Sequence, residues 1–251
     1  MELRKNRIKQ RLRDGKHVIA IENMNDADSV EQFAPNNPHC FWFEGEHFIA
    51  NPQNIGDLTR AADLINATSI VRVPRPEYQL IYHAFDLGAQ GVAVPHVKSR
   101  ADAELVVKAS KFSPIGQRGM FTSRQGIGVD DYFKKANDET FVLVFIEDLE
   151  AIENLDEILE VDNIDVFFVG PGDLSQELGH IGEQNHPEVD KVVQETIHRI
   201  TNKGRVAGTV ANINSYEWAM QTGARFFLSG TLDWINFGFY EFNKFIEKIK
   251  N

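Results

Sequence analysis

The sequence predicts that all 251 residues form a single (β/α)8 (TIM) barrel domain. Short apolar runs rich in β-branched and aromatic residues alternate with amphipathic helical stretches along the whole length. Eight candidate strands and eight candidate helices follow one another in strict alternation, as they do in such a barrel. A doubly wound open sheet would usually show a glycine-rich first turn, and the first turn here, Glu22-Asn23-Met24-Asn25, contains no glycine.

The predicted elements cover the chain without a domain linker, an internal repeat or a low-complexity tract. The strands are expected at Val18–Ile21, Phe41–Phe43, Ile70–Val73, Gly91–Val94, Phe141–Ile146, Ile164–Val169, Arg205–Val210 and Arg225–Leu228. The helices between them are expected near Ser29–Phe33, Asn54–Ile65, Glu77–Leu87, Ala101–Ala109, Leu149–Leu159, Pro187–Asn202 and Ser215–Gln221, with a last helix near Phe237–Ile249. The one long connection, Ser110 to Thr140, is expected to form a lid or a subunit contact.

Composition and charge restrict the possible partners. The formal net charge of −11 argues against nucleic acid or an anionic membrane as the main partner. Residues 1–16 are basic, and we expect an exposed helix there that packs on the barrel floor through Leu3, Ile8 and Leu12. The single cysteine, Cys40, can form neither an internal disulfide nor a metal cluster. No apolar run approaches the ~20 residues that span a bilayer, so a cytoplasmic protein is predicted.

The segment Phe141 to Leu178 carries the strongest functional signal. A buried strand ends at Glu147, an acidic helix follows, and a second buried strand leads to Gly170-Pro171-Gly172-Asp173. Consecutive parallel strands lie side by side, so both carboxylates should meet at the carboxyl edge of the barrel, where active sites of this fold lie. A divalent metal ion between Glu147 and Asp173 is the simplest explanation. Alternatively, each carboxylate caps the helix that follows it.

Other polar residues also end predicted strands. The ends read Glu44-Gly45-Glu46-His47, Arg72, Pro95-His96, Ala211-Asn212 and Ser229-Gly230. A guanidinium at the end of a buried strand needs an anionic partner, which favours a functional role for Arg72. Each histidine could instead be a solvated loop residue, and His96 is left open between the two interpretations.

This set suits the chemistry of a 2-oxo acid. A divalent cation held by two carboxylates keeps positions for a chelating ligand such as pyruvate, and as a Lewis acid it makes the methyl protons more acidic. Arg72 would stabilise the enolate oxygen, and N–H groups around Gly172 and Asp173 would bind the carboxylate. His47 would act as, or assist, the general base. No lysine ends a strand, which disfavours a Schiff-base mechanism.

Several stretches resemble the HpcH/HpaI family of metal-dependent class II pyruvate aldolases. The similarity extends over nearly the whole chain after about residue 40. It is carried by EGEHF (44–48), IVRVP (70–74), FDLGAQGVAVPHV (85–97), RGMFTSR (118–124), DYFKKANDE (131–139), IEDLEAIENLDEIL (146–159) and DVFFVGPGDLSQELGHIGEQNHPEV (165–189).

The resemblance implies a role for each matching residue. Glu147 and Asp173 match the metal ligands, for Mg²⁺, Mn²⁺ or Co²⁺, Arg72 the enolate-stabilising arginine, and His47 the catalytic histidine. Asp86 matches an acidic residue that works with that histidine. Because Asp86 is predicted near the barrel floor, such a role would act across a subunit interface. Family members are typically hexamers, trimers of dimers that exchange C-terminal helices, and the apolar stretch Trp234 to Ile249 suits that exchange.

Two positions depart from the family pattern and bear on the substrate. Members usually have Asp where this chain has Glu44, a position linked to the acceptor aldehyde, and many have Gln in place of Phe145. We therefore expect a lyase that cleaves or forms 4-hydroxy-2-oxo acids from pyruvate and an aldehyde through a metal-bound pyruvate enolate. A related enzyme acting on oxaloacetate or an acyl-CoA, as in citrate formation, and a non-catalytic barrel that binds a keto acid are the alternatives.

Overall fold

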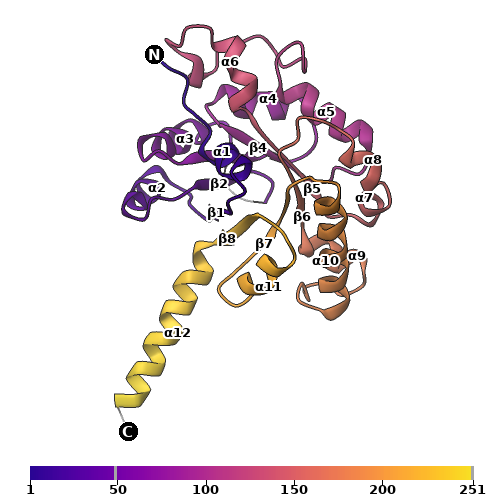
Figure 1. The fold of residues 1–251 in the computed structure, drawn as a ribbon. Helices are drawn as coiled ribbons and strands as arrows, with labels where there is room; N and C mark the ends of the chain where they lie inside the picture. Colours follow the sequence, from indigo (N-terminus) through magenta and orange to yellow (C-terminus); the bar gives the residue numbers. More distant parts are fainter. Residues whose placement is uncertain (48–49, 250–251) are drawn as a thin grey trace.

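A computed structural model describes residues 1–47 and 50–249, and it confirms the predicted barrel. The eight strands pair in parallel in sequence order, and the last closes onto the first (Figure 1). They are β1 (Val18–Glu22), β2 (Cys40–Glu44), β3 (Thr68–Arg72), β4 (Gly91–Val94), β5 (Phe141–Ile146), β6 (Val166–Val169), β7 (Ala207–Val210) and β8 (Phe226–Gly230). Each predicted strand is present, with its limits shifted by up to two residues.

Helices surround the barrel. They are α1 (Arg7–Arg13), α2 (Ala27–Gln32), α3 (Ile55–Leu64), α4 (Tyr78–Asp86), α5 (Arg100–Ser110), α6 (Tyr132–Glu139), α7 (Leu149–Glu153), α8 (Leu155–Leu159), α9 (Pro171–Glu177), α10 (Pro187–Asn202), α11 (Tyr216–Gln221) and α12 (Thr231–Ile249). In the described part of the chain, no helix is long and apolar enough to cross a membrane.

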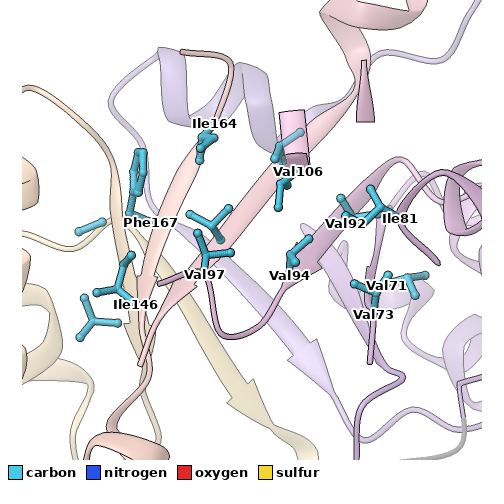
Figure 2. Packing of buried hydrophobic residues seen from close by; sticks show 14 of the residues in the cluster. Val71, Val73, Ile81, Val92, Val94, Val97, Val106, Ile146, Ile164 and Phe167 are labelled. Atoms are coloured by element: carbon cyan, nitrogen blue, oxygen red, sulfur yellow. The ribbon is translucent and has the colours of Figure 1, made fainter. Parts of the chain in front are cut away.

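Strand alternation divides the buried side chains into two layers. Trp42, Ile70 and Phe168 belong to a cluster that fills the barrel interior. Their strand neighbours, such as Val71 and Phe167, belong to a larger cluster between the strands and the helices (Figure 2). Successive side chains of a strand point to opposite faces, so one apolar run supplies both layers. This alternation also decides which residues reach the barrel mouth.

The N-terminal helix is shorter and less exposed than predicted. Only α1 is helical within residues 1–16, and Asn6 begins it by accepting a hydrogen bond from the N–H of Lys9 at 3.2 Å. Ile8 and Leu12 join the interior cluster and close the barrel floor, as expected. Leu3 instead packs in a small separate cluster with Phe112, Tyr132 and Ala136, so its predicted contact with the floor is wrong.

The predicted helix Leu149–Leu159 is two short helices, α7 and α8, which meet at Asn154. The Asn154 side chain donates to the carbonyl of Lys98 at 3.0 Å, and its backbone has non-helical angles. Asparagine competes in this way with helical hydrogen bonding, which explains the interruption. The last helix, in contrast, begins at Thr231 directly after β8, six residues earlier than predicted.

The long connection, residues 111–140, packs at the floor end of the barrel. It joins the end of α5 to the start of β5 and contains α6. Arg124 pairs with Asp63 at 2.6 Å, and the Glu139 carboxylate accepts the N–H of Asn6 at 2.7 Å. The segment is therefore no lid over the mouth of its own barrel.

Candidate active site

The top layer of the barrel interior is charged. Interior residues Ala20, Trp42, Ile70 and Phe145 are each followed two positions later by a charged residue: Glu22, Glu44, Arg72 and Glu147 respectively. Alternation along a strand directs residues two apart to the same face. The sequence therefore places four charged side chains over the apolar interior, at the carboxyl ends of β1, β2, β3 and β5.

Glycines make room for this layer. A Cβ at Gly170, two residues beyond Phe168, would lie 2.9 Å from Oε2 of Glu147. A Cβ at Gly45 would lie 2.5 Å from the carbonyl oxygen of Arg72, whose carbonyl accepts the Gly45 N–H at 3.0 Å. The contact at Gly45 is with backbone, so glycine is required where β2 turns beside β3. A side chain at position 170, where β6 leads into α9, would instead displace the carboxylate of Glu147.

The predicted carboxylate pair is brought together. Glu147 follows β5, and Asp173 lies in the first turn of α9. These two residues and His96 each offer a ligand atom, and the three atoms lie within 4.8 Å of one another. Carboxylate and imidazole donors at such spacing fit one divalent cation.

Arg72 lies among carboxylates. Its Nη2 is 3.4 Å from Oε2 of Glu147, it pairs closely with Oε2 of Glu46, and its Nη1 is 3.5 Å from Oε2 of Glu44. The guanidinium lies 4.2 Å above the ring of Phe145. The anionic partner expected for Arg72 is therefore a group of three carboxylates. The aromatic ring of Phe145 fixes the plane of the guanidinium.

Burial controls the charge of Glu147. The residue is 2% exposed, and burial raises the pKa of its carboxyl to about 7. Arg72 and the backbone N–H of His96, which donates to Oε1 at 3.0 Å, oppose that shift, whereas the charge of Asp173 adds to it. A buried carboxylate of raised pKa beside a second acid is typical of functional sites, and a bound cation would favour its ionised form.

Comparison with known proteins identifies the family. Residues 23–233 match the sequence model described as HpcH/HpaI aldolase/citrate lyase. The chain belongs to the HpcH/HpaI family. It is 33% identical over 228 residues to a hydroxypyruvate/pyruvate aldolase of Roseobacter denitrificans, covering 88% of this chain and 89% of that protein.

Further HpcH/HpaI relatives agree in sequence and in structure. A 2-keto-3-deoxy-L-rhamnonate aldolase of Salmonella gallinarum is 33% identical, covering 82% of this chain and 79% of that protein. The crystal structure of a family protein from Burkholderia cenocepacia superposes with a TM-score of 0.88, at 24% identity, over 98% of this chain and 100% of the other. The expected resemblance is therefore confirmed, and the relatives named aldolases are lyases.

The two residues expected to supply the HpcH/HpaI acid–base pair lie apart in the barrel. His47 is near the mouth, with a side chain 67% exposed and Nε2 3.5 Å from Oε2 of Glu46. Asp86 ends α4, close to the start of β4, and therefore lies at the floor. Its Oδ1 accepts a hydrogen bond from Nη2 of Arg118 at 2.9 Å. One barrel does not bring these two residues together.

The other expected substrate-binding residues lie at different depths of the mouth. Gly172 is in the first turn of α9 and is partly exposed. Phe145 is buried beneath Arg72, and the centroid of its ring lies 4.8 Å from that of Phe168. Oε1 of Glu44 accepts the N–H groups of Glu46 and His47 at 2.8 and 3.2 Å. Glu44 thus holds the loop after β2 as well as facing Arg72.

Sequence reasoning assigned no role to Glu46 or Glu22 and left His96 open, yet all three belong to the mouth. Glu46 contacts Arg72, and its Oε1 lies 3.6 Å from Nε2 of His96. Glu22 could have been found by strand alternation, since it follows Ala20 by two residues. Burial and the neighbouring Glu44 raise the pKa of Glu22 to about 7, although Arg72 acts in the opposite direction.

Replacing Glu22 with glutamine is expected to stabilise the metal-free protein at pH 8. A folded-state pKa raised from 4.5 to about 7 means that the stabilising effect of protonation is complete below pH 4.5 and is lost as the pH rises through 7. Glutamine should restore roughly 1–3 kcal/mol at pH 8 and little at pH 4.5. Thermal unfolding at both pH values, with the exposed Glu217→Gln as control, measures the effect. Equal stability of Glu22→Gln and wild type at pH 8 would disprove it.

Proposed function

We propose that the protein is a divalent-metal-dependent aldolase that cleaves or forms 4-hydroxy-2-oxo acids, with pyruvate as the enolate-forming partner and an aldehyde as the acceptor. The convergence of Glu147 and Asp173 beside Arg72 at the barrel mouth carries this proposal. Sequence similarity to relatives named hydroxypyruvate/pyruvate aldolase and 2-keto-3-deoxy-L-rhamnonate aldolase supports it. The single cysteine, buried and unpaired, is in keeping with a cytoplasmic location.

Glu147 and Asp173 would hold the cation, for which Mg²⁺, Mn²⁺ and Co²⁺ are the candidates. A bound divalent cation supplies Lewis acidity, which makes the methyl protons of a 2-oxo acid more acidic and stabilises the resulting enolate. The carboxylate oxygens present suit these ions. The buried position of Glu147 limits competition from water for the same oxygens.

The protein's own groups would position and polarise the substrate. Arg72 places its positive charge beside Glu147 and can stabilise the oxygen on which the enolate charge develops. Backbone N–H groups of Gly172 and Asp173, in the first turn of α9, can bind the substrate carboxylate. His47 would accept the proton directly or through water. Asp86 could assist His47 only if it came from another subunit.

Exchange of the pyruvate methyl protons tests this function. The protein is incubated with pyruvate in heavy water with Mg²⁺, Mn²⁺ or Co²⁺, and then with a chelator, while the methyl signal is followed by NMR. We expect exchange that depends on the metal. Pyruvate binding, seen as a raised melting temperature, without exchange under any of the metals would instead indicate a non-catalytic keto-acid-binding barrel.

A related reaction on oxaloacetate or an acyl-CoA is the second candidate. The position two residues before Glu147 carries an apolar ring, and Phe145 is enclosed by Arg72, Trp42 and Phe168. It therefore offers no polar group to an acceptor. Oxaloacetate decarboxylation and acetyl-CoA condensation, assayed with the same metals, separate this candidate from an aldolase.

We also propose that the protein is a homo-oligomer, a hexamer built as a trimer of dimers, in which α12 packs on a partner. This helix extends away from the barrel (Figure 1). Large apolar side chains are exposed along it, namely Leu232, Ile235, Phe237, Phe239, Tyr240, Phe242, Phe245 and Ile246. Near its base a mostly apolar groove of about 350 Å³, lined by Ile19, Met220 and Phe227 among others, crosses the outside of β8 and β1. A second copy of α12 suits this groove.

Charges on the apolar face of α12 are expected to disrupt the oligomer. The double variant Phe239→Glu/Phe242→Glu should sediment at a smaller mass than wild type, because two buried phenyl rings of the interface would become carboxylates. Lys248→Glu, an exposed position on the opposite side of the same helix from Phe239, is the matched control. An unchanged mass for the double variant would show that α12 does not form the interface.

A further inference from the structure

The loop after β4 carries His96, a side chain to which the two-carboxylate centre gives no role. We propose that His96 is a third protein ligand of the cation held by Glu147 and Asp173, so that the centre combines one nitrogen donor with two carboxylates. This inference rests on the proposed metal-dependent function and adds to it the identity of the metal that the site prefers. Its basis is the position of one backbone N–H and one imidazole ring.

The backbone of His96 is fixed to the metal ligand. Its φ is +52°, in the left-handed region that a non-glycine residue rarely adopts. In this conformation its N–H donates to Oε1 of Glu147 at 3.0 Å. Val92 and Val94 face the outer layer of the barrel, so simple alternation along β4 would direct residue 96 to the same side. The left-handed turn at His96 interrupts this alternation. A strained backbone is maintained only where its surroundings require it, and such positions concentrate at functional sites.

The ring lies between carboxylates. Its Nδ1 is 3.7 Å from Oε1 of Glu147 and 3.1 Å from Oδ2 of Asp148, and its Nε2 is 3.6 Å from Oε1 of Glu46. Metal-binding histidines almost always direct their second ring nitrogen at a carboxylate, a carbonyl or water. Here either nitrogen can bind the cation and leave a carboxylate near the other.

Two residues beside His96, the buried Asp148 and the partly exposed Lys98, hold that arrangement. Asp148 is 4% exposed, and its second oxygen pairs with Nζ of Lys98 at 2.8 Å. Lys98 thus balances the charge of Asp148 and keeps its carboxylate directed at the imidazole. The ring itself remains partly exposed, so an ion and a small substrate can reach it from the mouth.

A nitrogen ligand changes which ions the site favours. Imidazole suits Co²⁺, Ni²⁺ and Zn²⁺, whereas Mg²⁺ prefers oxygen donors. A centre with His96 should therefore favour these transition ions over Mg²⁺ much more strongly than one without it. If the ring were only an ion-pair partner of the acids around it, its removal would shift affinity for all divalent ions alike.

Pulsed electron paramagnetic resonance of the Mn²⁺-loaded protein tests the ligand directly. A bound imidazole nitrogen modulates the electron spin echo, and His96→Asn should remove that modulation while leaving Mn²⁺ bound. Asparagine tolerates the left-handed backbone and keeps the N–H donor to Glu147. A second histidine-containing group, His180 with Glu183 and His186, lies on the loop after α9. The measurements therefore use a His186→Asn background, in which Asn preserves the N-cap of α10.

Affinity provides the second readout. In the same background, His96→Asn should weaken Co²⁺ binding by about 10-fold or more and Mg²⁺ binding by less than about 3-fold. His96→Gly, which also tolerates the positive φ, should lose Co²⁺ affinity and regain part of it when free imidazole is added, because the ring position is partly exposed.

The outcomes separate this inference from the proposed function. Nitrogen modulation that disappears in His96→Asn, with a selective loss of Co²⁺ affinity, is the expected result. Mn²⁺ that binds through Glu147 with no nitrogen modulation would overturn the role of His96 and leave the two-carboxylate centre intact. Equal losses of Co²⁺ and Mg²⁺ affinity would also overturn it. Wild-type protein that binds no divalent ion would overturn the metal centre and the inference together.

Discussion

Glu147→Gln is expected to weaken divalent-cation binding by about 100-fold or more. Glutamine keeps the shape of the side chain and one oxygen for the His96 N–H, but it removes the negative charge that a hard cation requires. Titration calorimetry with Mn²⁺ measures the affinity, and pyruvate methyl exchange should be lost with it.

The fold should survive this change. Burial already raises the pKa of Glu147 to about 7, so a neutral group at this position costs the metal-free protein little. We expect the melting temperature of metal-free Glu147→Gln at pH 8 to equal or exceed that of wild type. Glu150→Gln, on the exposed side of α7, is the matched control and should bind the ion normally. Wild-type affinity in Glu147→Gln would mean that the cation binds elsewhere.

Arg72→Ala is expected to lower the turnover rate of the proposed aldolase reaction by 10²-fold or more, while divalent-cation binding persists. The guanidinium is the positive charge closest to Glu147 in the described residues, and removing one such electrostatic group typically has an effect of that size. Affinity for the metal ion should be retained or increased, because Glu44, Glu46 and Glu147 lose the guanidinium that balances their negative charge.

Arg72→Lys separates charge from geometry. Lysine keeps the positive charge but can neither contact three carboxylates with a planar fork nor lie flat on Phe145. Its turnover should fall between those of Arg72→Ala and wild type, while circular dichroism shows an intact fold in both variants. Turnover of Arg72→Ala within about threefold of wild type would remove Arg72 from the reaction.

Much of the barrel could be predicted because each strand and helix is encoded by a short stretch of neighbouring residues. Every strand is a short apolar run, and the parallel order follows from strict alternation with helices. The missed details depend on single competing interactions. The break at Asn154 depends on a hydrogen bond to Lys98, and the late start of α1, at Arg7, depends on the N-cap formed by Asn6.

The site residues that could be predicted are those that directly end a strand. Glu147, Arg72 and Glu44 each come two residues after an interior apolar residue, so alternation alone directs them into the mouth, and the same rule applies to Glu22. His96 could not be placed in this way, because its position depends on a left-handed backbone turn that no pattern of residue types reveals. The contact of Glu46 with Arg72 likewise depends on how the loop after β2 folds.

The proposed function requires one divalent cation between Glu147, directly after β5, and Asp173, in α9. Anomalous diffraction from a crystal grown with Mn²⁺ and pyruvate, collected on both sides of the manganese edge, tests it most directly. We predict a single strong peak within about 2.2 Å of a carboxylate oxygen of Glu147 and of Asp173, with pyruvate in contact with the ion. Pyruvate bound at the mouth with no anomalous peak between these two carboxylates would contradict the account.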